Sequence, residues 1–216
     1  MEKPALKLVV PETVNGTTEK PRRTMPNRRA NDKIRPRMHL TEAEITRLKA
    51  TALKVNHYGF RDSVMISLAF RSCLRVGELV TLTWSDVSWD DGKIHIRRLK
   101  GSDPSTHMIQ GDMIRALRRL KREQQPPSPF IFTSERDGAP LTTAAFRKML
   151  ARLGVAAGIG FPVNCHMLRH GGLTKLAGDG FDAITLAAYA GHRQLQNLQR
   201  YIRLSPEKFK NFRWND

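Results

Sequence analysis

A run of five residues, His166-Met167-Leu168-Arg169-His170, holds more chemical information than any other part of the sequence. His166 and Arg169 are three residues apart at the predicted start of a helix, so the imidazole and the guanidinium share one face. Helix N-termini attract anions, because their first amide groups have no partner within the helix. His166 and His170 could instead form a metal pair, but no acidic or cysteine ligand is placed to complete a zinc site. The run therefore predicts an anion site with no metal.

Two further groups follow downstream. Gly191-His192 comes after an apolar helical stretch, where a histidine could simply interact with the helix dipole at the C-terminus. Tyr201 lies nine residues beyond His192, within Gln199-Arg200-Tyr201-Ile202. A tyrosine in such a helix is otherwise explained by half-buried packing.

Two groups also lie upstream. Arg75 stands in Cys73-Leu74-Arg75-Val76-Gly77-Glu78-Leu79, at the predicted junction of two helices. Glu78, three residues on, could form a purely structural ion pair with it. Lys100-Gly101 lies at the predicted tip of a β-ribbon, where a lysine is exposed by default but can also reach a DNA backbone oxygen.

The order and spacing of these groups resemble the tyrosine recombinases, also called the phage integrase family. The resemblance extends from about Leu40 to Trp214. Within the family, the sequence is most similar to the short fimbrial phase-switch DNA invertases, which consist of little more than a catalytic domain. Their ribbon is similar to Arg98-Leu99-Lys100 and Ser105-Thr106-His107 here. We therefore expect a tyrosine recombinase catalytic-domain fold.

The resemblance implies that Tyr201 attacks a DNA phosphodiester and forms a covalent 3′-phosphotyrosyl intermediate. This intermediate conserves the bond energy, so no cofactor, ATP or metal is needed for resealing. Arg75 and Arg169 would neutralise the phosphate, since guanidiniums are always charged and bind phosphate oxygens in pairs. Lys100 would protonate the 5′-oxygen leaving group.

The remaining roles are supporting ones. The resemblance implies that His166 assists proton transfer or supports the phosphate, and that His192 donates to a non-bridging oxygen. Glu78 would orient Arg75, and His170 is interpreted as structural. The neighbouring pair Gly171-Gly172 and Ala190, which stands where the family usually has leucine, are expected to weaken packing locally.

Composition agrees with a nucleic-acid partner. The 216 residues include 37 Lys+Arg and 20 Asp+Glu, a net charge of +17, which attracts polyanions such as double-stranded DNA. A ribosomal or membrane-associated basic protein is the alternative. No apolar stretch is long enough for a transmembrane helix, and Val9-Val10 is soon followed by Pro11, which argues against a signal peptide. Cys73 and Cys165 indicate buried thiols in a reducing compartment, hence a cytoplasmic location.

Residues 1–37 differ in composition from the rest. They contain five of the twelve prolines, and ten Lys/Arg against four Asp/Glu. We predict a disordered basic arm. Most family members clamp DNA with an N-terminal helical domain that this segment cannot supply, so the arm is a candidate substitute; a passive solubilising tail is the alternative. The candidate phosphate contacts are Arg22, Arg23, Arg28, Arg29, Arg35 and Arg37.

Periodicity predicts a mostly α domain with one small antiparallel β-ribbon over residues 38–216. Thr41-Glu42-Ala43-Glu44 is a capping box flanked by Leu40 and Ile45, and it marks the start of the first helix. Predicted helices cover about 42–55, 61–74, 76–82, 113–122, 142–153, 167–177, 182–190 and 196–203. Predicted strands cover 93–98, 106–109 and 130–132.

The family exchanges strands with four protomers on two DNA sites, so the resemblance implies a tetramer, with DNA-bending accessory proteins as candidate partners. The tail at 204–216, with Phe209, Phe212 and Trp214, is expected to dock either on a neighbouring protomer or on its own domain. Two other functions are open: a DNA-binding regulator that has lost catalysis, and a type IB topoisomerase.

Overall fold

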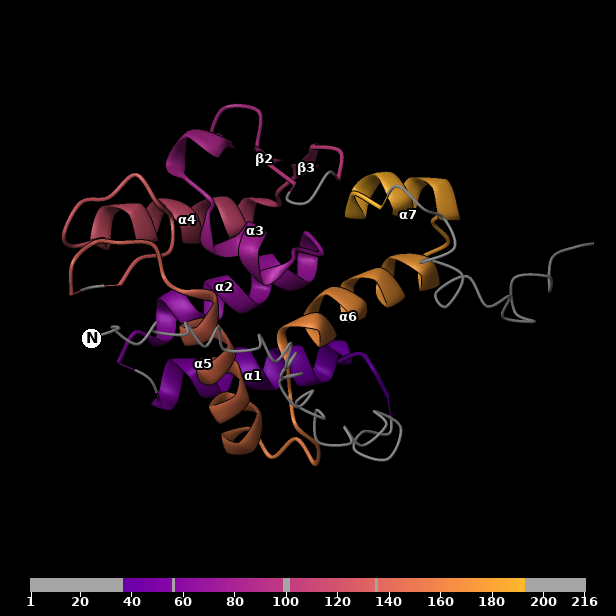
Figure 1. The fold of residues 1–216 in the computed structure, drawn as a ribbon, viewed down its shortest axis with the longest axis horizontal. Coiled ribbons are helices and arrows are strands. Elements are labelled where there is room, and N and C mark those ends of the chain that lie inside the picture. Colours follow the sequence, from indigo (N-terminus) through magenta and orange to yellow (C-terminus); the bar gives the residue numbers. More distant parts are fainter. Residues whose placement is uncertain (1–36, 56, 99–101, 135, 193–216) are drawn as a thin grey trace, which may run out of the picture.

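The computed structural model describes residues 37–55, 57–98, 102–134 and 136–192, and these form a mostly helical fold with one small sheet (Figure 1). The helices are α1 (Glu42–Val55), α2 (Gly59–Arg71), α3 (Val76–Val80), α4 (Gly111–Glu123), α5 (Thr143–Ala156), α6 (Cys165–Gly178) and α7 (Ala183–Ala190). The strands are β1 (Val87–Ser88), β2 (Lys93–Ile96) and β3 (Ser105–Met108), preceded by a short 3-10 turn at Trp84–Asp86. The predicted fold class is confirmed. The helix predicted at 196–203 lies outside the described residues.

The predicted capping box opens α1. The Thr41 amide donates to Glu44 Oε2 at 2.9 Å, and the Glu44 amide donates to Thr41 Oγ1 at 3.3 Å. Leu40 and Ile45 are both buried beside it, as a hydrophobic staple requires. Local sequence chemistry therefore fixes where the folded part begins.

The sheet is antiparallel in the order β1-β2-β3, with Ile94 opposite His107 and Ile96 opposite Ser105. Ile94, Ile96 and His107 face the interior, while His95 is exposed. This alternation is the period-two pattern of a strand pair with one buried face. Strand β1 was not predicted, because two residues are too few to show a period.

The strand predicted at 130–132 is wrong. Phe130 forms a single isolated bridge with Thr83, and the Ile131 amide donates to the Leu82 carbonyl at 2.9 Å. Ile131 and Phe132 are buried as expected. A short apolar run predicts that a segment is buried, but burial alone does not distinguish a strand from a buried loop.

The interior contains one large apolar cluster, formed mainly by α1, α2, α4, α5 and the sheet, and a smaller one. The smaller cluster includes Cys73, Leu173, Leu186 and Ala190, and it joins α6 to α7. In Figure 1, α6 and α7 lie on the opposite side of α3 from most of α4. No helix of the described residues has the length and apolar character needed to cross a membrane.

Gly171 and Gly172 let α6 lie close to the end of α2 and to the residue before the α1 cap. A Cβ at Gly172 would lie 2.1 Å from the Phe70 carbonyl oxygen and 2.7 Å from Cys73 Sγ. A Cβ at Gly171 would lie 2.6 Å from the Leu40 carbonyl oxygen. The expectation that this pair weakens local packing is therefore wrong. The missing side chains let two helix backbones approach directly, which places α6 against the end of α2.

We predict that Gly172→Ala destabilises the fold by about 1–3 kcal/mol, because backbone atoms of α2 must move to admit the methyl group. Gly178→Ala is the matched control on the same helix, since nothing lies within 4 Å of a Cβ there; it should be neutral or stabilising by less than about 1 kcal/mol. Urea denaturation measures both. Equal unfolding midpoints for the two variants would contradict the close contact.

Candidate active site

Arg75, His166, Arg169 and His192 come from three neighbouring helix ends. Arg75 is the N-cap of α3, and His166 and Arg169 lie in the first turns of α6. Asn164 caps α6 by accepting from the His166 amide at 3.0 Å. His192 follows Gly191, which ends α7 in the left-handed conformation with φ of 64°, a conformation that glycine adopts without strain.

Arg169 links these helix ends. Its side chain is almost fully buried. Nη1 donates to the Cys73 carbonyl, and Nη2 donates to the Ala190 carbonyl at 2.8 Å and lies 2.9 Å from His192 Nε2. Burial and the nearby charge of Arg75 lower the pKa of Arg169 to about 10, so it remains a cation at neutral pH.

The Cys73 backbone makes this link possible. The chain leaves α2 at Arg71, earlier than predicted, and Cys73 adopts a positive φ of 50°. A non-glycine residue rarely takes this conformation, which costs on the order of 1 kcal/mol. Here the turn brings the Cys73 carbonyl to Arg169. Both cysteines are free and buried, and burial raises the pKa of the Cys73 thiol to about 12.

Arg75 and Glu78 form the predicted contact. Arg75 Nη1 donates to Glu78 Oε1 at 2.7 Å, and the Arg75 amide donates to Glu78 Oε2 at 2.9 Å. The Arg75 side chain keeps 30% of its surface exposed, whereas the Glu78 side chain has none. Glu78, with Ser102 Oγ accepting from the same Nη1 at 3.3 Å, thus fixes the guanidinium and leaves part of it open to solvent.

Sequence reasoning missed Arg98. Its side chain is fully buried and pairs with Glu78 Oε2 at 2.7 Å. It also donates to the Tyr189 carbonyl and, from Nη2, to Ser105 Oγ at 3.0 Å. The signal that could have found it is the strand period: Ile94 and Ile96 face inward, so residue 98 continues the buried face.

His107 and Tyr189 were also missed. Their rings stack with centroids 3.8 Å apart, and His107 Nε2 lies 3.0 Å from the Tyr189 carbonyl oxygen. His107 is buried, and its Nδ1 has no hydrogen-bond partner. Burial, followed by the charge of Arg98, lowers the pKa of His107 to about 4, so the ring is neutral at pH 7.

His166 lies at the edge of the same cluster. Partial desolvation, followed by the positive charges of Arg169, Arg75 and Arg147, lowers its pKa. Arg147 on α5 was not predicted as part of the site. His170 lies one turn further along α6, with its ring centroid 6.1 Å from that of His166. The neutral form of His166, which can accept a proton, is therefore favoured at neutral pH.

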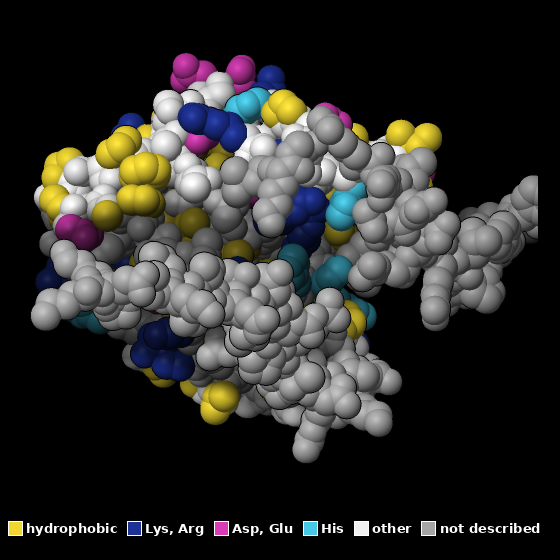
Figure 2. Space-filling model, in the orientation of Figure 1, with side chains coloured by type: hydrophobic (Ala, Val, Ile, Leu, Met, Phe, Trp, Pro, Cys, Tyr) yellow, Lys and Arg dark blue, Asp and Glu magenta, His cyan; other side chains and the backbone are white. Residues whose placement is uncertain are grey.

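Taken together, three guanidiniums surround one carboxylate at this place: Arg75, Arg98 and Arg169 around Glu78. Such an excess of positive charge in a partly buried setting is suited to an anion. Figure 2 shows Lys or Arg and His side chains next to one another near the middle of this face. Within the described residues, no group of three or more His, Cys, Asp or Glu side chains is arranged to hold a metal ion.

The structure does not place every predicted site residue. Lys100, Tyr201, Arg22, Arg23, Arg28, Arg29 and Arg35 lie outside the described residues. Arg37, the arm arginine that is described, pairs with Glu44 at 2.9 Å from Nη1 and lies over the Phe161 ring. Its charge is therefore already engaged by the folded domain.

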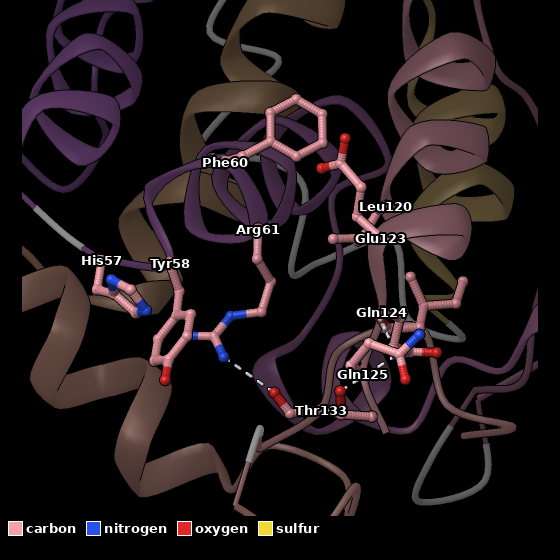
Figure 3. A pocket seen from close by; sticks show the side chains of 10 residues that line it. His57, Tyr58, Phe60, Arg61, Leu120, Glu123, Gln124, Gln125 and Thr133 are labelled. Carbon is pink, nitrogen blue, oxygen red and sulfur yellow. Dashed lines mark hydrogen bonds between the residues drawn. The ribbon is translucent and has the colours of Figure 1, made fainter. Parts of the chain in front are cut away.

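A separate hollow of about 200 Å³ lies between the α1–α2 turn and the end of α4 (Figure 3). Arg61 donates to the Thr133 carbonyl at 2.9 Å, and the Gln124 amide donates to the Phe130 carbonyl at 2.9 Å. None of the predicted site residues lines it. Its polar groups hold the 124–133 segment in place.

Solved structures with the same architecture define the class as tyrosine recombinase catalytic domains. The XerA recombinase crystal structure superposes with a TM-score of 0.69 at 26% identity, covering 82% of this chain and 66% of that one. The XerH site-specific recombinase bound to its difH substrate superposes with a TM-score of 0.68 at 22% identity, covering 80% and 52%, and it supports the fold alone.

The family is shown by sequence. The model of the phage integrase family matches residues 38–208. The type 1 fimbriae regulatory protein FimE of Escherichia coli K12 is 30% identical over 178 residues, covering 80% of this chain and 89% of that protein. This chain therefore belongs to the phage integrase family, and the resemblance to tyrosine recombinases and their fimbrial members is confirmed.

The buried histidine predicts how stability depends on pH. The folded-state pKa of His107, about 4, is below its ordinary value of 6.5, so the unfolded chain binds the proton more readily. Stability is then complete above about pH 6.5 and falls as the pH is lowered toward 4, by up to about 3 kcal/mol from this group. His107→Gln, which retains a donor for the Tyr189 carbonyl, should flatten this dependence.

Urea denaturation at a series of pH values between 7 and 4.5 measures the effect. His95→Gln is the matched control, because His95 is exposed on the opposite face of the same strand pair. An identical pH dependence in wild type and His107→Gln would show that His107 does not titrate in this way.

Proposed function

We propose that this protein is a site-specific DNA recombinase that cleaves and rejoins DNA through a covalent 3′-phosphotyrosyl intermediate on Tyr201. The observation that carries the proposal is the cationic cluster at three helix ends, with the Arg75 guanidinium held by Glu78 and partly open to solvent. A family relationship to recombinases and a site suited to a phosphate support the same reaction.

Arg75 and Arg169 neutralise the charge that builds on the non-bridging phosphate oxygens. Both guanidiniums are oriented before DNA arrives, by Glu78 and by main-chain carbonyls, so little reorganisation accompanies the reaction. Preorganised donors of this kind contribute about 3–4 kcal/mol each to lowering a barrier.

His192 and His166 assist the arginines. His192 Nε2 accepts from Arg169 Nη2 at 2.9 Å. In the proposed mechanism phosphate replaces it as the acceptor of Arg169, and the neutral ring in its Nε2–H tautomer then donates to a non-bridging oxygen. His166, whose pKa is lowered by desolvation and the surrounding arginines, is suited to accept the tyrosine proton. A neutral imidazole is required for that step.

Tyr201 and Lys100 carry out bond breaking. The Tyr201 oxygen bonds to phosphorus as the bond from phosphorus to the 5′-oxygen breaks, and Lys100 protonates the departing 5′-oxygen to give the 5′-hydroxyl. Attack by that hydroxyl on the phosphotyrosine reverses the step and reseals the strand, so the reaction consumes no cofactor.

The partner in this proposal is double-stranded DNA, bound as two sites by four protomers in the cytoplasm, with DNA-bending proteins as possible helpers. A relative, XerH, has been crystallised on its difH substrate before cleavage. The basic residues of segment 1–37 contribute phosphate contacts in this proposal.

We predict that Tyr201→Phe abolishes covalent protein–DNA adducts while leaving DNA affinity within about twofold, because only the nucleophilic oxygen is removed. Nicked duplexes from the surrounding genomic DNA are incubated with each protein in EDTA and resolved on a denaturing gel. An adduct with wild type alone also locates the cleavage position.

Three results would point elsewhere. Adducts that persist in Tyr201→Phe would identify a different nucleophile. Binding by wild type without any adduct would favour a regulator that has lost catalysis. Relaxation of supercoiled plasmids that lack a specific site would favour a type IB topoisomerase.

A second prediction concerns the basic arm. Removal of residues 1–36 takes away nine of the ten basic residues in residues 1–37 and should weaken DNA binding most at low salt. Each lost phosphate contact lowers the slope of log affinity against log salt by about 0.9. Fluorescence anisotropy at a series of salt concentrations measures the slope.

The full-length chain with Arg22, Arg23, Arg28, Arg29 and Arg35 changed to glutamine is the matched control, because it keeps the length and removes charge. It should behave like the truncated protein. An unchanged slope in both variants would identify the arm as a passive tail.

A further inference from the structure

The Arg98 guanidinium joins three elements that the proposed reaction depends on. Its side chain has no exposed surface, so it cannot touch DNA in this arrangement. It contacts Glu78 in α3, the Tyr189 carbonyl in α7 and the Ser105 hydroxyl in β3. A buried guanidinium with this many fixed acceptors is held in a single orientation.

The contact between Arg98 and Glu78 affects how much of the Arg75 charge is neutralised by Glu78. Glu78 Oε1 accepts from Arg75 and Oε2 accepts from Arg98, each at 2.7 Å. With Arg98 present, the carboxylate is already balanced, and the Arg75 charge is available to an incoming phosphate. Without it, Arg75 alone would balance a buried carboxylate, and its attraction for phosphate would fall.

The contacts of Arg98 with the end of α7 determine the position of His192, which directly follows that helix and Gly191. Arg98 donates to the Tyr189 carbonyl, three residues before His192. A Cβ at Gly191 would lie 2.9 Å from Arg98 Nε and 3.0 Å from its Cδ, so the end of α7 rests directly on this side chain. His107 supports the arrangement by stacking on Tyr189.

We propose that Arg98 is a positioning residue for DNA cleavage, acting through Glu78 on Arg75 and through the end of α7 on His192. This inference rests on the function proposed above. Arg98 precedes Lys100 by two residues in the sequence, so the residue that prepares the phosphate site and the proposed general acid are near neighbours along the chain.

The test compares cleavage of two nicked duplexes at the position located by the adduct gel: one with the normal phosphodiester, one with a methylphosphonate. The methylphosphonate replaces a charged non-bridging oxygen with a methyl group, so it needs less neutralisation by Arg75. The measurement is the rate of adduct formation at saturating protein.

We expect Arg98→Met to slow cleavage of the phosphodiester by about 10- to 100-fold, as is typical for groups that orient catalytic side chains. The defect should be at least several-fold smaller on the methylphosphonate, as it should be for Arg75→Ala. Arg98→Lys should also remain slow, because one ammonium cannot reproduce a planar fork with three acceptors.

Leu173→Ala is the matched structural control, because Leu173 is fully buried in the α6–α7 cluster and lacks a charged group. Any loss of rate it causes should be the same on both substrates. Circular dichroism and thermal melting establish that each variant is folded.

A folded Arg98→Met that cleaves at the wild-type rate would overturn the inference, as would a defect of equal size on both substrates. Full activity in Arg98→Lys would assign the effect to charge alone, and unfolding of both variants would assign Arg98 a structural role; either overturns positioning. Wild type that forms no adduct would instead overturn the proposed function, which separates the two failures.

Discussion

A single buried carboxylate, Glu78, is the interaction on which the site depends. Burial alone would raise its pKa, but the Arg75 amide and the Arg75 and Arg98 guanidiniums bring the pKa below its usual value. Glu78 is therefore an anion whose single negative charge is shared between two of the three cations around it, Arg75 and Arg98. Arg169 is left to main-chain carbonyls, which supply partial rather than full negative charge. The cluster thus has a net positive charge that only an incoming anion can compensate.

The scaffold serves to keep these charges at fixed separations. The contact of Gly171 and Gly172 with the end of α2 determines how closely α6 packs against α2. The left-handed conformation of Cys73 directs its carbonyl toward Arg169. Arg75 follows two residues later as the cap of α3. Backbone packing, rather than long flexible side chains, therefore determines the distance between the two arginines.

Much of this could be predicted from the sequence. The capping box at Thr41 and most of the helices follow from local signals, and the meeting of Arg75, Glu78, Arg169 and His192 follows from the resemblance to the family. Arg98 continues the buried alternation of Ile94 and Ile96, but a charged side chain was not expected at a buried position, and no local pattern pairs His107 with Tyr189. Their role arises from tertiary contacts between β2, β3 and α7. The wrong prediction of a strand at 130–132 also comes from tertiary contacts, because this buried segment pairs with Leu82 and Thr83, which are not part of a strand.

The two main-chain oxygens that hold Arg169 have an evolutionary consequence. Every residue supplies a carbonyl, so mutation at positions 73 and 190 changes side chains without removing the acceptor. Substitutions at these two positions are limited by the space available to the side chain and, at Cys73, by the left-handed backbone. They are not limited by the need for an acceptor. Ala190 is fully buried, and its carbonyl is an acceptor for Arg169 that does not depend on which side chain stands there. A site anchored in this way can lose sequence similarity at its supports while the arginine itself stays in place.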